Sequence, residues 1–423
     1  MVGMPAKWPR AHVGPALMVA GAKALAGASI VALNLWVAHH LAPAAYGVFA
    51  VAVTALMLMD GVVGTAFDAA VIRGAGANPE EAASASEHAG LLMKLGAGLL
   101  VSAGAAIVIG IAVSPVAAAV AALAGLGGTG MLAHRSLLVY LQLRERFGWY
   151  TVVDLTQTIL RCTLIAVVLT SGYTTAVAAV AAYSAAPWLI ACAALLIGVG
   201  IRAGVRARRA DFSDVVRSAG LSLATTSVGA VVSRLDLFLM SIAGTAAETG
   251  VFAAASTLAL VPTWLGAYLA PTLSGRILPY CRARRMKQFF AEVQGVLLIA
   301  GVVGMVVGVT LGPALILRFL PPGYAGAARV VPVLLGAGVA GFVTFPLILH
   351  TLLFLSPRTY LVMDLISIVF VVPAYIVAAR RFGALGVAWV TSVSAVVKAL
   401  IAQTAAATAV RRAEAESAYG VAV

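Results

Sequence analysis

Apolar stretches long enough to cross a lipid bilayer follow one another along almost the entire chain. A transmembrane helix needs about 20 predominantly apolar residues, and the sequence divides into twelve such stretches with short connections. The composition agrees, because 62% of the 423 residues are hydrophobic and only 10% are charged, with a mean hydropathy of +1.04. The sequence therefore predicts an all-α polytopic membrane protein with about twelve transmembrane helices, and it excludes a soluble globular chain.

The predicted spans fall into two groups of six. Those of the first half are Val13–Ala38, Tyr46–Ile72, Ala89–Val113, Pro115–Gln142, Trp149–Thr170 and Thr175–Ile201. Those of the second half are Ser213–Ala243, Gly250–Ser274, Ala291–Leu317, Ala327–Phe354, Tyr360–Ala379 and Gly386–Val410.

The second half of the chain repeats features of the first half. Two sets of residues match in the same order, at shifts of 203 and 210 positions: Gly47-Val48-Phe49-Ala50 with Gly250-Val251-Phe252-Ala253, and Tyr150 and Asp154 with Tyr360 and Asp364. We expect parallel repeats, because six crossings return the chain to its starting side. The predicted domains are residues 1–205 and 206–423, two six-helix bundles around a central cavity.

The net charge of +13 arises mostly from lysines and arginines in alternate loops. Because positively charged loops stay on the cytoplasmic side, both termini of this multi-pass protein are predicted to be cytoplasmic. The first apolar stretch runs directly into a second crossing, so we interpret it as an uncleaved anchor. No soluble domain is predicted that could bind nucleic acid. Cys162, Cys192 and Cys281 lack CxxC spacing, so neither disulfides nor a metal site are expected.

Several ionisable residues fall inside predicted helices, where such side chains are costly and usually paired or functional. Lys23 and Asn34 share one face of the first helix, and Asp60 lies at a similar depth in the second. Two interpretations remain open for Lys23, a structural ion pair with Asp60 or an encounter with an anionic ligand. In the fifth predicted helix, Asp154 lies in the early turns, where its negative charge suits the helix N-terminus. Arg161 needs a partner or water, because arginine stays charged.

The seventh predicted helix carries a continuous polar stripe with a charged pair at its end. Its members recur at helical spacing: Ser222, Thr226, Gly229, Ser233 and Asp236. Arg234 stands beside this stripe, so we expect the face to line an aqueous cavity. In the last predicted helix, Lys398 shares a face with Thr391 and Ser394.

Three other polar residues near the inner helix ends suggest only exposure to solvent. Lys94 is close enough to the membrane surface for its ammonium group to snorkel. His134 and Arg135 lie near the end of the fourth predicted helix, and a solvated helix end is the favoured interpretation of both.

Five motifs occur in a fixed order along the chain: Leu41-Ala42-Pro43-Ala44-Ala45-Tyr46-Gly47, Ser233-Arg234-Leu235-Asp236, Thr249-Gly250-Val251-Phe252, Pro322-Gly323-Tyr324 and Gly383-Ala384-Leu385-Gly386-Val387-Ala388. In these motifs the chain resembles the polysaccharide transporter family, the oligosaccharide or O-antigen flippases of the multidrug/oligosaccharidyl-lipid/polysaccharide exporter superfamily. The resemblance covers nearly the full length. Ala42 departs from the family's glycine, and Val251 stands where isoleucine, leucine or tyrosine is commoner.

The resemblance implies a flippase that carries undecaprenyl-diphosphate-linked oligosaccharide across the bacterial inner membrane by alternating access. Its product would enter O-antigen, lipopolysaccharide, capsule or exopolysaccharide synthesis. The expected partners are the lipid-linked oligosaccharide, the phospholipid bilayer and a polysaccharide polymerase. A functional monomer suffices, because the cavity is complete within one chain.

Buried cations suit a diphosphate group, which needs cationic partners to leave water. The candidate substrate-binding residues are Lys23, Arg161, Arg234, Lys398, Asn34 and Ser233. The candidate coupling or gating residues are Asp60, Asp236, Asp154 and Asp364. No cofactor is expected beyond a coupling ion, either a proton or sodium.

Two other functions would also suit a polytopic helical chain. A cation-coupled multidrug antiporter of the same superfamily would need an acidic, aromatic-lined cavity, whereas the buried residues here lean basic. A membrane glycosyltransferase or polymerase would place acids or bases on sizeable outer loops, and the connections here are short. We therefore expect no catalytic residues and no enzyme activity.

Overall fold

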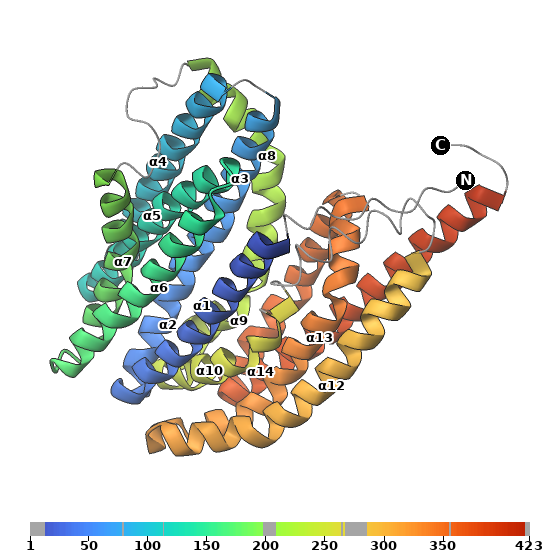
Figure 1. The fold of residues 1–423 in the computed structure, drawn as a ribbon. Coiled ribbons are helices and arrows are strands. Elements are labelled where there is room, and N and C mark those ends of the chain that lie inside the picture. The colour runs from blue at the N-terminus through green and yellow to red at the C-terminus, as the bar shows by residue number, and fades with distance from the viewer. Residues whose placement is uncertain are drawn as a thin grey trace. The chain divides into compact units, whose positions relative to one another are not determined.

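The computed structural model describes residues 13–77, 80–112, 114–197, 209–263, 265–266, 286–354 and 357–418. Within these ranges the chain is helical and contains no strand (Figure 1). Nine of the described helices are long and apolar enough to cross a membrane. The fold is therefore that of an all-α polytopic membrane protein, as predicted.

The described chain forms two compact units, one of residues Val13–Phe238 and one from Leu239 onward. This division follows spatial contacts, whereas the predicted boundary between residues 205 and 206 follows the sequence repeat. Residues 198–208 lie outside the described ranges, so that domain boundary stays a prediction.

The first unit contains the six helices expected of the first half. They are α1 (Val13–His40), α2 (Pro43–Met59), which continues through the π-helical turn η2 (Asp60–Gly64) into α3 (Thr65–Ala77), α4 (Glu80–Ala112), α5 (Pro115–Leu143), α6 (Phe147–Thr170) and α7 (Ala176–Leu196). The helix α5 packs against α4, α7 and α2, and α1 packs along α6 (Figure 1). The predicted second crossing is thus one path made of α2, η2 and α3.

Small residues let α5 occupy the middle of this unit. A Cβ atom on Gly130 would lie 2.7 Å from Cδ1 of Trp188, and one on Gly128 would collide with Met59. The Trp188 ring is fixed there by a 2.8 Å hydrogen bond from its Nε1 to the carbonyl oxygen of Leu126. The glycine-rich segment therefore provides close helix packing, as expected of small residues in membrane helices.

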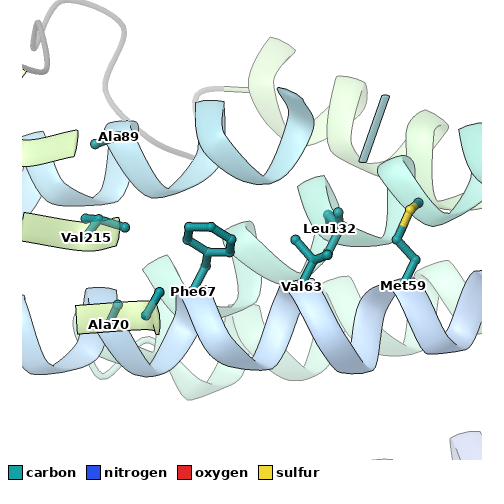
Figure 2. Close-up of a cluster of buried hydrophobic side chains, with 8 residues drawn as sticks. Met59, Val63, Phe67, Ala70, Ala89, Leu132 and Val215 are labelled. Atoms are coloured by element: carbon teal, nitrogen blue, oxygen red, sulfur yellow. The ribbon is translucent and has the colours of Figure 1, made fainter. Parts of the chain in front are cut away.

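A buried apolar cluster joins α8 (Arg209–Val232) to the other helices of the first unit. Met59, Val63 and Phe67 lie in a row (Figure 2). They share one helix face because they are four residues apart. The rest of the cluster comes from α3, α4, α5 and α8: Ala70, Ala89, Leu132, Val215 and Ala219. Through these contacts α8 packs against α3 and α4.

The predicted seventh helix, Ser213–Ala243, is wrong in one respect. The helix α8 ends at Val232, a turn occupies Ser233 and Arg234, and α9 (Leu235–Ala243) begins a separate helix. The polar stripe is consequently interrupted before Asp236. The side chains of Ser222 and Thr226 lie outside the described part of the structure.

The second unit contains both short and long helices. They are α10 (Ala246–Ala259), α12 (Met286–Phe319), the 3₁₀ turn η3 (Pro322–Tyr324), α13 (Ala327–Phe354) and α14 (Pro357–Ala418). The helix α13 packs against α10, α12 and α14. Part of the predicted span Gly250–Ser274 falls outside the described residues.

The last two predicted crossings are the two arms of α14, which bends at Gly383. This glycine has φ of +58° and ψ of −146°, so the helix is interrupted there. A Cβ atom at the same position would collide with the carboxylate of Glu248 on α10. The sequence predicted a break between residues 379 and 386, and the structure confirms it.

Candidate functional site

Three helices of the first unit bring Lys23, Asp154 and His134 together. The Nζ atom of Lys23 on α1 lies 2.8 Å from Oδ2 of Asp154 on α6. On the other side of the same carboxylate, Nε2 of His134 on α5 lies 3.8 Å from Oδ1. The Lys23 ammonium also lies 5.4 Å from the ring centre of Tyr150, one helical turn before Asp154. Asp154 is therefore shared between a lysine and a histidine.

The proposed Lys23–Asp60 ion pair is wrong, because Lys23 pairs with Asp154 instead. Asp154 consequently does more than favour the start of a helix. Asp60 instead contacts Arg135, and Oδ2 of Asp60 lies 3.1 Å from Nη1 of Arg135. Depth in the membrane suggested the wrong partner, since depth does not define which helices are neighbours.

A second buried group of charges surrounds Asp68 on α3. Its carboxylate receives the ammonium of Lys94 on α4 and Nε of Arg135 on α5. The guanidinium of Arg135 also donates to Asp60 and, at 3.1 Å, to the hydroxyl of Thr65. Two carboxylates and two cations thus neutralise one another across four consecutive elements, an arrangement that reduces the cost of buried charge.

Gly64, at the end of the π-helical turn, leaves room for Arg135 to reach both carboxylates. A Cβ atom on Gly64 would lie 2.9 Å from Cδ of Arg135, so the side chain crosses the glycine directly. Lys94 completes its contacts with a 3.0 Å hydrogen bond to the hydroxyl of Ser136. We refer to Asp60, Asp68, Lys94 and Arg135 as the four-charge cluster.

The solvent-exposed interpretation of Lys94 and His134 is wrong, whereas Arg135 is partly exposed. Lys94 is 2% exposed and His134 is 3% exposed, while Arg135 is engaged by two carboxylates. Each residue lies within a turn or two of a predicted helix end, which favoured snorkelling. A carboxylate on a neighbouring element lies beside each of them, and such partners cannot be identified from one helix alone.

Arg161 on α6 is buried without a carboxylate partner among the described residues. Its Nη1 donates to the hydroxyl of Tyr183 at 3.0 Å, and its guanidinium carbon lies 4.2 Å from that ring's centre. Its Nη2 contacts the sulfur of Met131 at 3.0 Å. The expectation that Arg161 must find a partner is confirmed. The partner is an aromatic ring, which attracts a cation through its π face.

The second unit contains a corresponding lysine–aspartate pair. Nζ of Lys398 lies 2.8 Å from Oδ1 of Asp364, and both residues belong to α14 on opposite sides of its bend. Asp364 is the residue that repeats Asp154. Each repeated aspartate thus binds a lysine, although the lysine comes from α1 in one unit and from the last helix in the other.

The remaining predicted residues make local contacts. The hydroxyl of Ser233 donates to the carbonyl of Ala230 at 2.7 Å, and a carboxylate oxygen of Asp236 accepts from the amide of Leu237 at 2.8 Å. Arg234 is close enough to Asp236 for their charges to attract. Asn34 is half-buried on α1. Their roles in binding or gating stay predictions.

Together, these helices define a membrane protein with the fold of the transporters of the MOP superfamily. A multidrug resistance transporter of the MATE family in an inward-facing conformation is 15% identical and superimposes with a TM-score of 0.69, over 91% of this chain and 95% of its own. The lipid II flippase MurJ in an inward closed conformation is 14% identical, with a TM-score of 0.72 over 90% of this chain and 87% of its own.

A third similar structure is a MOP superfamily transporter from Pyrococcus furiosus. It is 13% identical, with a TM-score of 0.62 over 94% of this chain and 95% of its own, and is described as having a binding pocket of reverse polarity that suggests a different function. No protein-family model and no curated protein matches the sequence. At these identities the likeness defines the fold, and the predicted superfamily fold is confirmed.

Proposed function

We propose that this protein is a transporter that flips a lipid-linked oligosaccharide, carried on undecaprenyl diphosphate, across the bacterial inner membrane. The observation that carries the proposal is the difference in exposure between the lysine and the aspartate of each pair. The side chain of Lys23 is 33% exposed against 11% for Asp154, and that of Lys398 is 32% exposed against 5% for Asp364. In each pair the cation is the accessible member.

A partly exposed cation backed by a buried carboxylate suits an anionic ligand. A diphosphate that approaches either lysine meets the ammonium group first, and charge-assisted hydrogen bonds to phosphate oxygens can then replace those to the carboxylate. In the first unit, Arg161 adds a positive charge that no described carboxylate neutralises. An organic cation would meet the same positive groups and be repelled.

The comparisons support transport and leave the substrate open. One similar protein is a lipid II flippase, which supports a lipid-linked substrate. Another is a multidrug transporter, so a cation-coupled antiporter stays the second candidate. The description of the Pyrococcus protein suggests that the polarity of the pocket distinguishes functions within this fold.

Alternating access completes the proposal. The diphosphate would enter from the cytoplasm, contact Lys23 and the other candidate cations, and leave on the outer side after the two repeats move. Asp154 and Asp364 would neutralise the lysines when no substrate is bound. The lipid tail would remain in the bilayer, and a polysaccharide polymerase would receive the product.

Transport of an undecaprenyl-diphosphate-linked oligosaccharide into proteoliposomes tests the proposal. Charge-balanced variants, Lys23→Met with Asp154→Asn and Lys398→Met with Asp364→Asn, avoid leaving a buried carboxylate unpaired. We expect each to reduce transport at least about tenfold, the equivalent of one lost charged contact. Arg318→Gln, at an exposed position of α12, should transport normally.

Two results would oppose the flippase. Unchanged transport by both balanced variants at wild-type abundance would remove the lysines from the substrate site. Efflux of an organic cation under an ion gradient, without movement of the lipid-linked sugar, would establish the antiporter instead.

A further inference from the structure

His134 is a buried histidine whose ring nitrogens have no hydrogen-bond partner in the described structure. The residue is 3% exposed, and both Nδ1 and Nε2 are buried. Buried polar atoms are nearly always paired, so an unpaired imidazole in the middle of a helix bundle needs an explanation. Neither the substrate site proposed above nor the four-charge cluster uses this ring.

The carboxylate of Asp154 lies close to this ring. Nε2 of His134 lies 3.8 Å from Oδ1 of Asp154, which is too far for a hydrogen bond. A protonated Nε2 would attract this carboxylate, and a movement of about 1 Å would create a charge-assisted hydrogen bond. Oδ2 of the same carboxylate already binds the Lys23 ammonium at 2.8 Å.

The other charges around His134 decide when a proton can stay there. Lys23 on α1 and Arg161 on α6 act on the ring as positive charges, and Asp154 on α6 as the negative one. The ring of Tyr183 on α7 is engaged by Arg161. The charges on the remaining sides neutralise one another within the four-charge cluster: Asp60 on η2, Asp68 on α3, Lys94 on α4 and Arg135 on α5.

Lys23, Asp154 and neutral His134 carry no net charge together. A proton on His134 adds a positive charge beside two cations, so it is disfavoured while Lys23 depends on Asp154. An anion at Lys23 reverses this balance, because the lysine then has another partner and Asp154 can move toward the imidazole.

We propose that His134 and Asp154 form a proton-binding site that fills when an anionic group binds Lys23. The proton comes from the aqueous phase and attaches to Nε2, and no other bond forms or breaks. Because coupling between two ligands is reciprocal, protonation of His134 also strengthens anion binding at Lys23. The inference rests on the proposed function, since it gives the head-group site its coupling ion.

Calorimetry of farnesyl diphosphate binding to the whole protein in detergent, repeated in buffers of different ionisation enthalpy, measures the protons taken up. We expect wild-type protein to take up nearly one proton more per bound diphosphate than His134→Gln, because the phosphate's own protonation is common to both. The control His39→Gln changes an exposed histidine at the end of α1 and should match wild type. Equal uptake by wild type and His134→Gln would overturn the coupling.

A measurement without ligand separates this inference from the proposed function. In protein with ¹⁵N-labelled histidine, Lys23→Met should leave His134 as the sole described ionic partner of Asp154, with protons on both ring nitrogens at pH 7. The double variant Lys23→Met with Asp154→Asn should show only one, and His134→Gln assigns the signal. A singly protonated ring in both variants would refute the proton site.

The two failures look different. If no diphosphate binds but the ring is doubly protonated in Lys23→Met alone, the head-group proposal and the coupling fail while the proton site stands. If diphosphate binds without the additional proton, the head-group proposal stands and the coupling fails.

Discussion

Asp68 is the carboxylate that joins the two cations of the four-charge cluster. Its carboxylate contacts both Lys94 and Arg135, whereas Asp60 contacts Arg135. Lys94 is 2% exposed, so it cannot turn to water if the carboxylate is lost. Removing one member of a buried ionic group leaves an uncompensated charge, which costs more than the intact group contributes.

We expect Asp68→Asn to destabilise the folded protein by about 3–5 kcal/mol, because it leaves two cations with one carboxylate. Thermal unfolding in detergent, followed by fluorescence-detected gel filtration, would measure the loss. Adding Lys94→Met restores the charge balance and should recover much of the stability.

Glu145→Gln provides the matched control, since it removes a carboxylate at an exposed turn. It should unfold like wild type within about 0.5 kcal/mol. A four-charge cluster that tolerates Asp68→Asn equally well would show that water reaches Lys94.

At this scale the sequence predicted that buried charges matter but not how they pair. Lys23, Asp154 and Arg161 were identified because charge inside an apolar stretch is conspicuous. Lys94, His134 and Arg135 were missed because position along a single helix does not reveal the carboxylate that lies across from it.

Among the elements, α14 shows most clearly how one residue controls a helix. Its two arms meet at Gly383, which has φ of +58° and lies against Glu248 of α10. The backbone amide of Glu248 donates a 3.2 Å hydrogen bond to the hydroxyl of Thr245, which fixes Glu248 at the start of α10. The bend therefore has both a backbone and a packing requirement for glycine.

We expect Gly383→Ala to cost about 1–3 kcal/mol, because a side chain is strained at positive φ and would collide with Glu248. The midpoint of thermal unfolding should fall accordingly. Gly304→Ala in α12 is the control, since a Cβ atom there meets nothing within 4 Å. It should be neutral or slightly stabilising, as expected for alanine in a helix. Equal effects of both changes would argue that the bend tolerates other conformations.

Apolar length was sufficient to predict most of the helices and the break in α14. It was insufficient where a polar turn interrupts a span, as at Ser233 and Arg234. The π-helical turn at Asp60–Gly64 was not predicted, because a single-turn π-bulge within an apolar stretch leaves few polar residues to mark the change in periodicity.

At the scale of the molecule, the repeated sequence has diverged in where it places its lysines. Asp154 and Asp364 match in the predicted sequence repeat, yet Lys23 lies on α1, well before Asp154 on α6, and Lys398 follows Asp364 within the same bent helix. The repeat therefore preserves the carboxylate and the accessible cation, while changing the element that supplies the cation.

The orientation of the whole chain in the membrane is the last prediction. Glu145 lies between Arg144 and Arg146 in the α5–α6 turn, whereas the α6–α7 turn around Tyr173 carries no charged residue from 171 to 175. Because arginine-rich loops stay in the cytoplasm, Glu145 should face the cytoplasm and Tyr173 the outside. The N-terminus then lies with Glu145, since four crossings separate them.

Single cysteines at these exposed positions test the orientation in intact cells, after Cys162, Cys192 and Cys281 are replaced by serine. A membrane-impermeant maleimide should label Tyr173→Cys directly and Glu145→Cys only after the membrane is opened. The reverse pattern would place both termini outside. It would then contradict the orientation that the arginine-rich loops predict.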